Sequence, residues 1–385
     1  MAEIIQRSKA IEQPPEPASR RACWGVPPWQ IDFRPAPRPV PEQVDVAIVG
    51  AGFTGLAAAA WLRHISPQTS VVVFESDSIG AGSSGRTGGM TLAESAAGDL
   101  PALGDVLDNF GRILRELGID CDLHLPGAWE VGRKDHLPNS PIVWQDSGDL
   151  RVTGEFPGGH CDPGKLVSGL ARAADRTGAA IIENTCVDEI HSNHDGLRVR
   201  LGEREVRAHH AILATNAFSL EMSSLAPQAE PKLTLVVATK PIRPADLEIL
   251  GLASRRPFYT SDLPYLWGRV MPNSGIIFGG GLVDASNWRD LESLDIAAGK
   301  PAELIASIER RVRGLHPTLR TIEFSHWWGG PVLFADDWKP VFRAHPSLPN
   351  TTVIGAFSGH GVALSVYFGA WAAEVVLGRK QLPTW

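Results

Sequence analysis

Four residues near the start of the chain have the types and spacing that bind a dinucleotide. The stretch 50–55 reads GAGFTG, a GxGxxG pattern, and an acid, Glu75, follows twenty residues after Gly55. Gly50 permits a tight turn, Gly52 lets the backbone approach a phosphate, and Gly55 lets the next helix pack closely. Glu75 is placed to accept hydrogen bonds from ribose hydroxyls. The pattern therefore predicts a dinucleotide site, and by itself it fits NAD as well as FAD.

Two further glycine-rich runs bear on that choice. Residues 80–90 read GAGSSGRTGGM, and residues 355–362 read GAFSGHGV. The first exposes backbone N–H groups beside a cation, so it predicts a second anion or flavin-edge cradle, although a surface loop would look the same. The second opens a helix whose positive end could stabilise charge on a reduced flavin, unless it is an unrelated strand-to-helix turn. An NAD enzyme would leave this second run unused.

The segments around these runs predict the elements that position them. Buried strands are expected at 44–49 and 70–75, on either side of an alanine-rich helix at 56–62, which is a β-α-β unit. More strands are expected at 179–183, 211–214 and 351–354, followed by a buried helix at 362–377. Between about 225 and 320 the runs alternate, as at 233–237 and 275–279, which predicts an antiparallel sheet with a helix at 302–313.

The first 43 residues form a proline-rich arm. Prolines at positions 14, 15, 17, 27, 28, 35, 37, 39 and 41 exclude a helix or a central strand there. We expect an extended or disordered arm, part of which Trp24 and Trp29 pin to the body of the protein.

Composition excludes several classes of partner. Lys and Arg total 36 against 43 Asp and Glu, a net charge of −7, which does not favour binding to nucleic acid or to an anionic membrane. No export signal is evident, and the most apolar stretch, 362–377, is too short to span a bilayer. The four cysteines form no CxxC pair, so we expect reduced thiols, no metal site and a cytoplasmic location.

Taken together, the motifs resemble the FAD-dependent amine and amino-acid oxidoreductases of the D-amino-acid oxidase superfamily, and within it the gamma-glutamylputrescine oxidase-like enzymes. The resemblance runs from about Val44 to Gly378. The order and spacing of the matching segments are specific to the superfamily. The segments that carry it are 46–55, SGRTGG at 84–89, LGIDC at 117–121, DPGKL at 162–166, ATNA at 214–217, FGG at 278–280 and SGHGV at 358–362.

The resemblance implies a mixed α/β fold in which a Rossmann-like FAD-binding domain is interleaved with an antiparallel or mixed-sheet substrate domain. We assign residues 44–100, 155–224 and 322–385 to the FAD domain, and residues 101–154 and 225–321 to the substrate domain. The cofactor contacts that it implies are Gly50, Gly52, Thr54, Gly55, Glu75, Ser76, Gly85, Arg86, Thr87, Gly88, Gly89, Met90, Val187, Ala214, Asn216, Gly359, His360, Gly361 and Val362.

The chain departs from the family pattern near the flavin. Thr87 stands where the subgroup usually has Asn, and Met90 where it often has Gln. Related sarcosine oxidases place a lysine beside flavin N5, and the approximate alignment puts Ile276 or Ile277 there. Residues 80–90 contain neither His nor Cys, so we expect FAD to be bound without a covalent bond.

The implied reaction is oxidation of a C–N bond by hydride transfer to flavin N5, giving an imine that hydrolyses. The partners would be a small amine or amino acid, and oxygen or another electron acceptor. Substrate-pocket candidates are Tyr265, Trp267, Arg269 and Trp328, together with His326 and Trp327. Aromatic rings could surround an ammonium, and Arg269 could bind a carboxylate. The alternatives are an NAD-dependent dehydrogenase and a flavin-binding protein without turnover.

Overall fold

One of two large sheets carries the predicted β-α-β unit. The structure, a computed structural model, describes residues 22–385. In this sheet β1 is parallel to both β2 and β11, β2 to β8, and β11 to β18. The strands in order are β17 (Val341–Ala344), β18 (Thr351–Gly355), β11 (Arg204–Leu213), β1 (Gln43–Val49), β2 (Val71–Phe74) and β8 (Ala180–Ile182), with β9 (Glu189–Asn193) and β10 (Gly196–Leu201) attached through β11.

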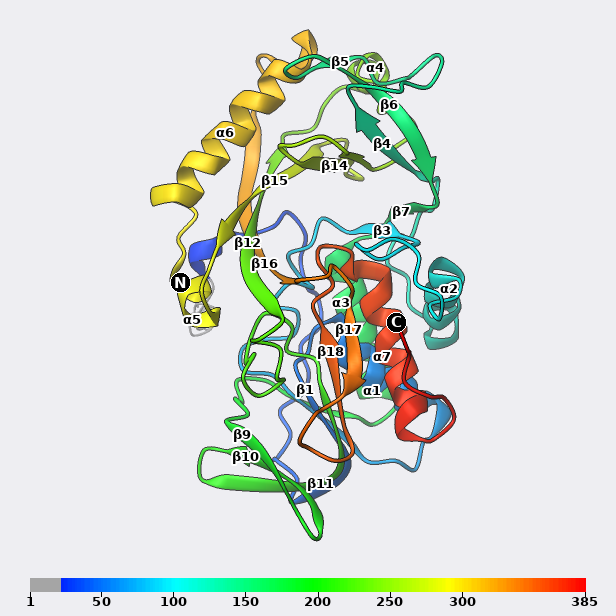
Figure 1. The fold of residues 1–385 in the computed structure, drawn as a ribbon, viewed down its shortest axis with the longest axis vertical. Coiled ribbons are helices and arrows are strands. Elements are labelled where there is room, and N and C mark those ends of the chain that lie inside the picture. Colours follow the sequence, from blue (N-terminus) through cyan, green and yellow to red (C-terminus); the bar gives the residue numbers. More distant parts are fainter. Residues whose placement is uncertain (1–21) are drawn as a thin grey trace, which may run out of the picture.

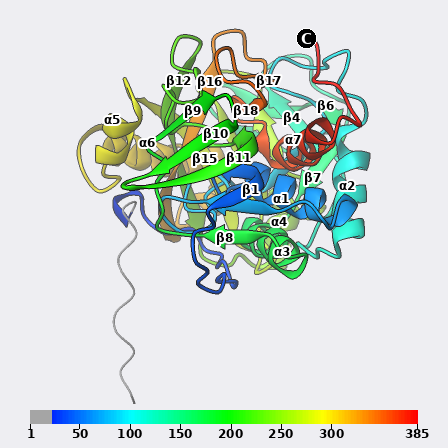
Figure 2. The same ribbon diagram turned by 90° about the horizontal axis from the view of Figure 1, so that it is seen from below.

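Helices cover one face of this sheet. They are α1 (Phe53–Ile65), α2 (Val106–Leu117), α3 (Pro163–Arg176) and α7 (Gly361–Val376), which gather on one side of the molecule in Figure 2. Val46 and Ile48 of β1 pack in the core formed with these helices, whereas Ala47 and Val49 pack in the core on the other face. Burial on both faces explains why β1 and β2 are almost continuously apolar.

The second sheet forms the other half of the molecule (Figure 1). Its strands in order are β16 (Phe324–Ala335), β12 (Ala229–Thr239), β15 (Ile276–Asp284), β14 (Leu266–Val270), β13 (Phe258–Thr260), β4 (Ala128–Gly132), β6 (Asp149–Phe156) and β5 (Trp144–Gln145). All pairs except β13 with β4 are antiparallel. Helix α6 (Gly299–Leu315) runs along its outer side, near α4 (Pro244–Ile249) at one end and α5 (Trp288–Ser293) at the other (Figure 1).

A small sheet of β3 (Met90–Leu92) and β7 (Gly158–His160) joins the two halves. The remaining regular elements are two short 3-10 helices, η1 (Ala22–Trp24) and η2 (Pro317–Leu319). Among residues 22–385, no helix is long and apolar enough to cross a membrane.

The mixed α/β class is confirmed, and each segment predicted as a strand or helix overlaps one of that type. The predicted division into domains differs from the observed arrangement in more than one place. We expected residues 101–154 in the substrate domain, but α2, which lies within them, packs with α1, α3 and α7 on the first sheet. We expected residues 322–385 in the FAD domain, but β16 pairs with β12 along its length and so lies in the second sheet. This segment follows the central run without any composition break that could have marked the change.

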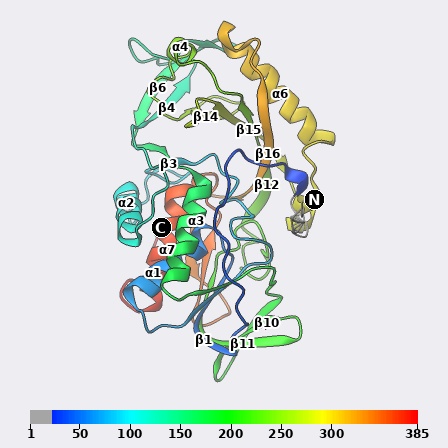
Figure 3. The ribbon, with the colours of Figure 1, turned by 180° about the vertical axis from the view of Figure 1, so that it is seen from behind.

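The described part of the arm crosses the back of the molecule toward β1 (Figure 3). Residues 26–41 contain no helix or strand, as the prolines predict. Trp24 is completely buried, and its indole N–H donates to the carbonyl of Leu291 at 3.2 Å. Trp29 packs edge-on against Trp328. Both tryptophans therefore pin the arm as predicted, while residues 1–21 lie outside the described part of the chain.

Candidate cofactor and substrate cavity

A cavity of about 1500 Å³ extends between the two halves of the molecule. Its walls include the turn after β1, the end of β2, the 80–90 loop and the turn before α7, together with residues of β12, β14 and β15. Ligand pockets commonly measure about 300–1,000 Å³. The volume is therefore large enough for a dinucleotide and a small substrate side by side.

One end of the cavity, where the sequence predicts the nucleotide, is built around Glu75. Its carboxylate accepts from the backbone N–H of Ala51 at 2.8 Å and of Asp77 at 3.0 Å. Gly50 adopts φ +104°, and a Cβ at Gly55 would lie 1.9 Å from the carbonyl oxygen of Gly50. Both positions therefore require glycine, in the roles that the GxGxxG spacing predicts.

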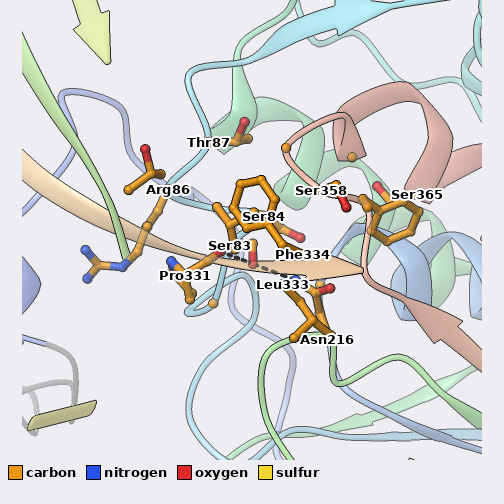
Figure 4. A pocket seen from close by; sticks show the side chains of 18 of the residues that line it. Ser83, Ser84, Arg86, Thr87, Asn216, Pro331, Leu333, Phe334, Ser358 and Ser365 are labelled. Atoms are coloured by element: carbon orange, nitrogen blue, oxygen red, sulfur yellow. Dashed lines mark hydrogen bonds between the residues drawn. The ribbon is translucent and has the colours of Figure 1, made fainter. Parts of the chain in front are cut away.

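The serines of the 80–90 loop tie this turn to the second sheet (Figure 4). Ser84 Oγ accepts from the N–H of Phe53, the first residue of α1, at 2.9 Å. Ser83 Oγ donates to the carbonyl of Pro331 at 2.7 Å and accepts from Asn216 Nδ2 at 3.1 Å. The loop is thus held against the N-terminus of α1, where helix dipoles favour an anion.

Arg86 lies at the cavity wall but directs its guanidinium away from the serines (Figure 4). Its Nη1 donates to the carbonyls of Gly25 at 2.9 Å and of Gly329 at 3.2 Å. The carbonyl oxygen of Arg86 accepts from the indole of Trp328 at 2.9 Å. The side chain therefore fastens the loop to the arm and to β16.

The turn before α7 forms the opposite wall. His360 caps the helix without a side-chain hydrogen bond, and Gly361 is its first residue. Nδ1 of His360 is buried and makes no hydrogen bond within residues 22–385. Burial lowers the pKa of His360, so its neutral form is favoured. A buried polar nitrogen without a partner, in a residue that lines the cavity, fits a site built to meet a polar ligand.

Trp267 lies between the 80–90 loop and β15, next to the predicted cofactor residues. A Cβ added at Gly88 would lie 2.2 Å from its ring, and one at Gly279 would lie 2.1 Å from it. The indole is therefore packed between the 80–90 loop and β15, and both glycines are required by its bulk. Trp267 and Tyr265, two of the predicted substrate-pocket residues, line the cavity.

The other substrate candidates lie elsewhere. Arg269 is buried outside the cavity lining, and its Nε donates to the carbonyl of Gly88, so it is not placed to bind a substrate carboxylate. Trp328 is completely buried behind the loop. Trp327 is partly exposed and donates to Glu309 at 2.6 Å, and His326 does not line the cavity. The assignment of these four residues to the pocket is corrected accordingly.

Most predicted cofactor residues do line the cavity. Three do not, namely Gly55, Gly85 and Gly89, which instead allow close backbone packing. Those that line it are Gly50, Gly52, Thr54, Glu75, Ser76, Arg86, Thr87, Gly88, Met90, Val187, Ala214, Asn216, Gly359, His360, Gly361 and Val362.

Sequence reasoning missed three polar residues that line the cavity near Trp267 and Tyr265. Glu94, Glu130 and Tyr259 line the cavity together with Trp267. Glu94 comes shortly after the 80–90 loop, which was a signal that could have been followed. Glu130 and Tyr259 come from distant segments that β4 and β13 bring into register, so nothing local in the sequence marked them.

The comparison with protein families decides the identity. Residues 45–375 match the family described as DAO, FAD dependent oxidoreductase. The chain belongs to this family. It is therefore an oxidoreductase whose cofactor is FAD, and the glycine turn, Glu75 and the unpartnered His360 nitrogen are features that fit such a group.

Among the described residues, no group of three or more His, Cys, Asp or Glu side chains is arranged to hold a metal.

Curated relatives agree with this assignment. The chain is 27% identical to "Probable oxidoreductase OrdL" of Rhizobium meliloti, over 89% of this chain and 85% of that protein. It is 26% identical to "Gamma-glutamylputrescine oxidoreductase" of Escherichia coli, over 88% of this chain and 84% of that protein. A glycine oxidase of Bacillus licheniformis is 23% identical over 89% of this chain and 96% of that protein.

Solved structures show the same fold. Glycine oxidase from Geobacillus kaustophilus has a TM-score of 0.70 at 19% identity, covering 89% of this chain and 96% of that chain. L-proline dehydrogenase from P. horikoshii has the same TM-score at 18% identity, with the same coverage of both chains.

Proposed function

We propose that this FAD-dependent oxidoreductase oxidises the C–N bond of a small amine or amino acid. The relatives named above include an oxidoreductase of gamma-glutamylputrescine and a glycine oxidase, which supports this substrate class. A hydride, carrying two electrons, leaves the α-carbon, and the nitrogen loses a proton to give an imine. Water then converts the imine to a carbonyl compound and ammonia or an amine.

The observation that carries the proposal is the continuity of the cavity. It runs without a break from Glu75, at the nucleotide end, past Gly88 to Trp267 and Tyr265. FAD supplies the hydride acceptor when bound. The chain itself has to bind the amine, orient its α-carbon and exclude water, which are contributions of position rather than of a dedicated base.

The residues assigned to cofactor binding have distinct parts in the proposal. The carboxylate of Glu75 would accept from the ribose, while the N-terminus of α1 would meet the pyrophosphate. The N-terminus of α7, behind His360 and Gly361, would face the flavin edge that gains charge on reduction. Binding without a covalent bond is supported by the lack of His and Cys in residues 80–90.

Anaerobic reduction tests the proposal directly. The purified holoprotein is mixed with a panel of amines and amino acids in the absence of oxygen, and flavin absorbance is followed. Bleaching by at least one compound, with release of the matching aldehyde or keto acid, is the expected result. A flavin that no compound in the panel reduces would leave a binding protein without turnover. Readmission of oxygen then tells whether oxygen reoxidises the flavin or another acceptor is required.

A further inference from the structure

We infer that the substrate end of the cavity selects an amine bearing a second positive charge, and that the carboxylates of Glu94 and Glu130 bind this distal ammonium. A linear diamine is the simplest such substrate. The inference rests on the proposed function, because it names the substrate class of the same site.

The two acids approach the cavity from different elements. Glu94 lies two residues beyond β3, and Met90, the first residue of β3, also lines the cavity. Four residues of extended chain span at most about 14 Å, so Glu94 is within reach of a small molecule that also contacts the 80–90 loop. Glu130 is the central residue of β4 and accepts from the hydroxyl of Thr153 at 3.3 Å. Tyr259 is in register with Glu130 on the neighbouring strand.

Nothing in the described part of the chain neutralises Glu94. It has neither a hydrogen bond nor an ion pair with any residue in 22–385. Burial raises the pKa of Glu94, and the nearby acids Asp99 and Glu130 raise it further. The pKa of Tyr259 is also raised, first by burial and then by Glu130 and Glu94. Several acids close to a partly buried carboxyl repel one another, and a bound cation would reduce this unfavourable repulsion.

The same region offers no cation for a substrate carboxylate. Arg86 and Arg289 are the arginines among the described lining residues, and no lysine is among them. Arg86 is engaged by the arm and β16, while Arg289 is exposed and lies over the ring of Trp288 at 4.4 Å. Arg269 donates to Gly88 from outside the cavity. An α-carboxylate placed near Glu94 would therefore be repelled, which disfavours simple amino acids.

Aromatic side chains complete the region. Tyr259, Tyr265 and Trp267 line the cavity with the two acids. Their rings offer apolar surface for the methylene chain, and ring faces attract an ammonium. This combination of aromatic walls with carboxylates at one end matches a chain of methylenes that ends in a cation.

Four small compounds separate the possibilities. The holoprotein is reduced anaerobically with 1,4-diaminobutane, n-butylamine, 4-aminobutanoate and glycine. We expect the diamine to reduce the flavin with the highest kcat/KM. In Glu94→Gln and Glu130→Gln, KM for the diamine should rise about ten- to hundredfold, because a charge-assisted hydrogen bond is lost. The ratio of kcat/KM for the diamine to kcat/KM for n-butylamine should fall by a similar factor, because n-butylamine has no second ammonium to lose this contact.

Glu155→Gln is the matched control. Glu155 is exposed on β6 and pairs with Arg256 at 2.8 Å, outside the cavity lining. The Glu155→Gln substitution removes the same charge from the same sheet and should leave the preference for the diamine unchanged. An equal loss in this variant would mean that the effect is one of overall charge, and would overturn the inference.

Failure of the inference differs from failure of the proposed function. Faster reduction by glycine or 4-aminobutanoate than by the diamine overturns the inference and leaves C–N oxidation standing. Unchanged selectivity in both glutamine variants does the same. Absence of reduction by every amine and amino acid contradicts the proposed function and, with it, the inference. The comparison of the four compounds uses the wild-type protein, so it does not depend on any variant folding.

Discussion

The indole N–H of Trp29 donates to the carbonyl oxygen of Gly85 at 2.7 Å and so joins the N-terminal arm to the 80–90 loop. The arm also supplies the carbonyl of Gly25 to Arg86, one residue further along that loop. Both contacts reach the loop from behind the cavity. The arm is therefore positioned to hold a cofactor wall in place.

Removing the indole donor should weaken FAD binding. Trp29→Phe keeps a ring against Trp328 but loses the bond to Gly85, which is worth about 1 kcal/mol, so FAD should bind about fivefold more weakly. The measurement is FAD affinity of the reconstituted apoprotein. Trp61→Phe is the control, because it removes a 3.3 Å indole bond to Glu374, away from the loop. Equal affinities in the two variants would mean that the arm does not support the site.

Glu75 should prove essential for retaining the cofactor. Glu75→Ala removes the predicted ribose acceptor and also the acceptor of the Ala51 and Asp77 N–H groups. The loss of a charged acceptor costs about 1.5–3 kcal/mol, a ten- to hundredfold weaker site. We expect a folded protein that loses FAD on gel filtration, with Glu75→Gln intermediate. If circular dichroism shows a native fold and FAD is retained as tightly as before, the assignment of Glu75 is wrong.

The sequence predicts the glycine turns well because their chemistry is local. Strand, tight turn and helix follow one another in the chain, so the spacing alone predicts the structural roles of Gly50 and Gly55. Which residues line the other end of the cavity depends instead on where along each strand the cavity ends. Trp267 and Arg269 lie two residues apart on β14 and point to the same face, yet only Trp267 lines the cavity, because the Gly88 backbone covers Arg269. Such coverage is set by tertiary packing, which no local pattern encodes.

Close packing of α1 against α7 should make Gly369 indispensable. A Cβ there would lie 2.3 Å from the carbonyl oxygen of Thr54. Gly369→Ala should therefore destabilise the protein by about 1–3 kcal/mol through overpacking. Gly314 is the contrast, since it lies in α6 with no atom within 4 Å of an added Cβ. Gly314→Ala should stabilise by up to about 1 kcal/mol through helix propensity. Denaturant unfolding of both variants checks the opposite signs.

His160 should make stability depend on mildly acidic pH. Burial, and then the charges of Arg269, His124 and Arg255, lower the pKa of His160 from 6.5 to about 4. In the unfolded chain His160 becomes protonated below pH 6.5, whereas in the folded protein it becomes protonated only near pH 4. The neutral His160 therefore contributes fully to the free energy of unfolding above pH 6.5. This contribution, about 3 kcal/mol, is lost as the pH falls from 6.5 to about 4.

A non-titrating ring at this position separates His160 from the other groups. His160→Phe should lose less stability than the wild type between pH 7.5 and pH 5, measured by urea unfolding at each pH. His194→Phe serves as the control because its side chain is 86% exposed. Parallel pH profiles for wild type and His160→Phe would show that the buried imidazole does not titrate in this range.

The turn before α7 should tune the flavin potential. A Cβ at Gly361 would lie 3.3 Å from Cβ of Phe357, so the branched side chain of Gly361→Val should displace the turn. The positive end of α7 would then stabilise the reduced, anionic flavin less well. A loss of about 1–2 kcal/mol lowers a two-electron potential by roughly 20–40 mV. It slows a step that depends on this charge about five- to thirtyfold.

Redox titration of the folded, flavin-loaded variant measures this shift directly. Gly314→Val places the same side chain on α6, where there is open space around the added Cβ, and should leave the potential unchanged. Thermal unfolding of both variants reports any loss of stability separately from the potential. A Gly361→Val protein that is less stable but has the wild-type potential would show that the turn only packs the helix. A lowered potential together with slower anaerobic bleaching would place the N-terminus of α7 at the reacting edge of the flavin.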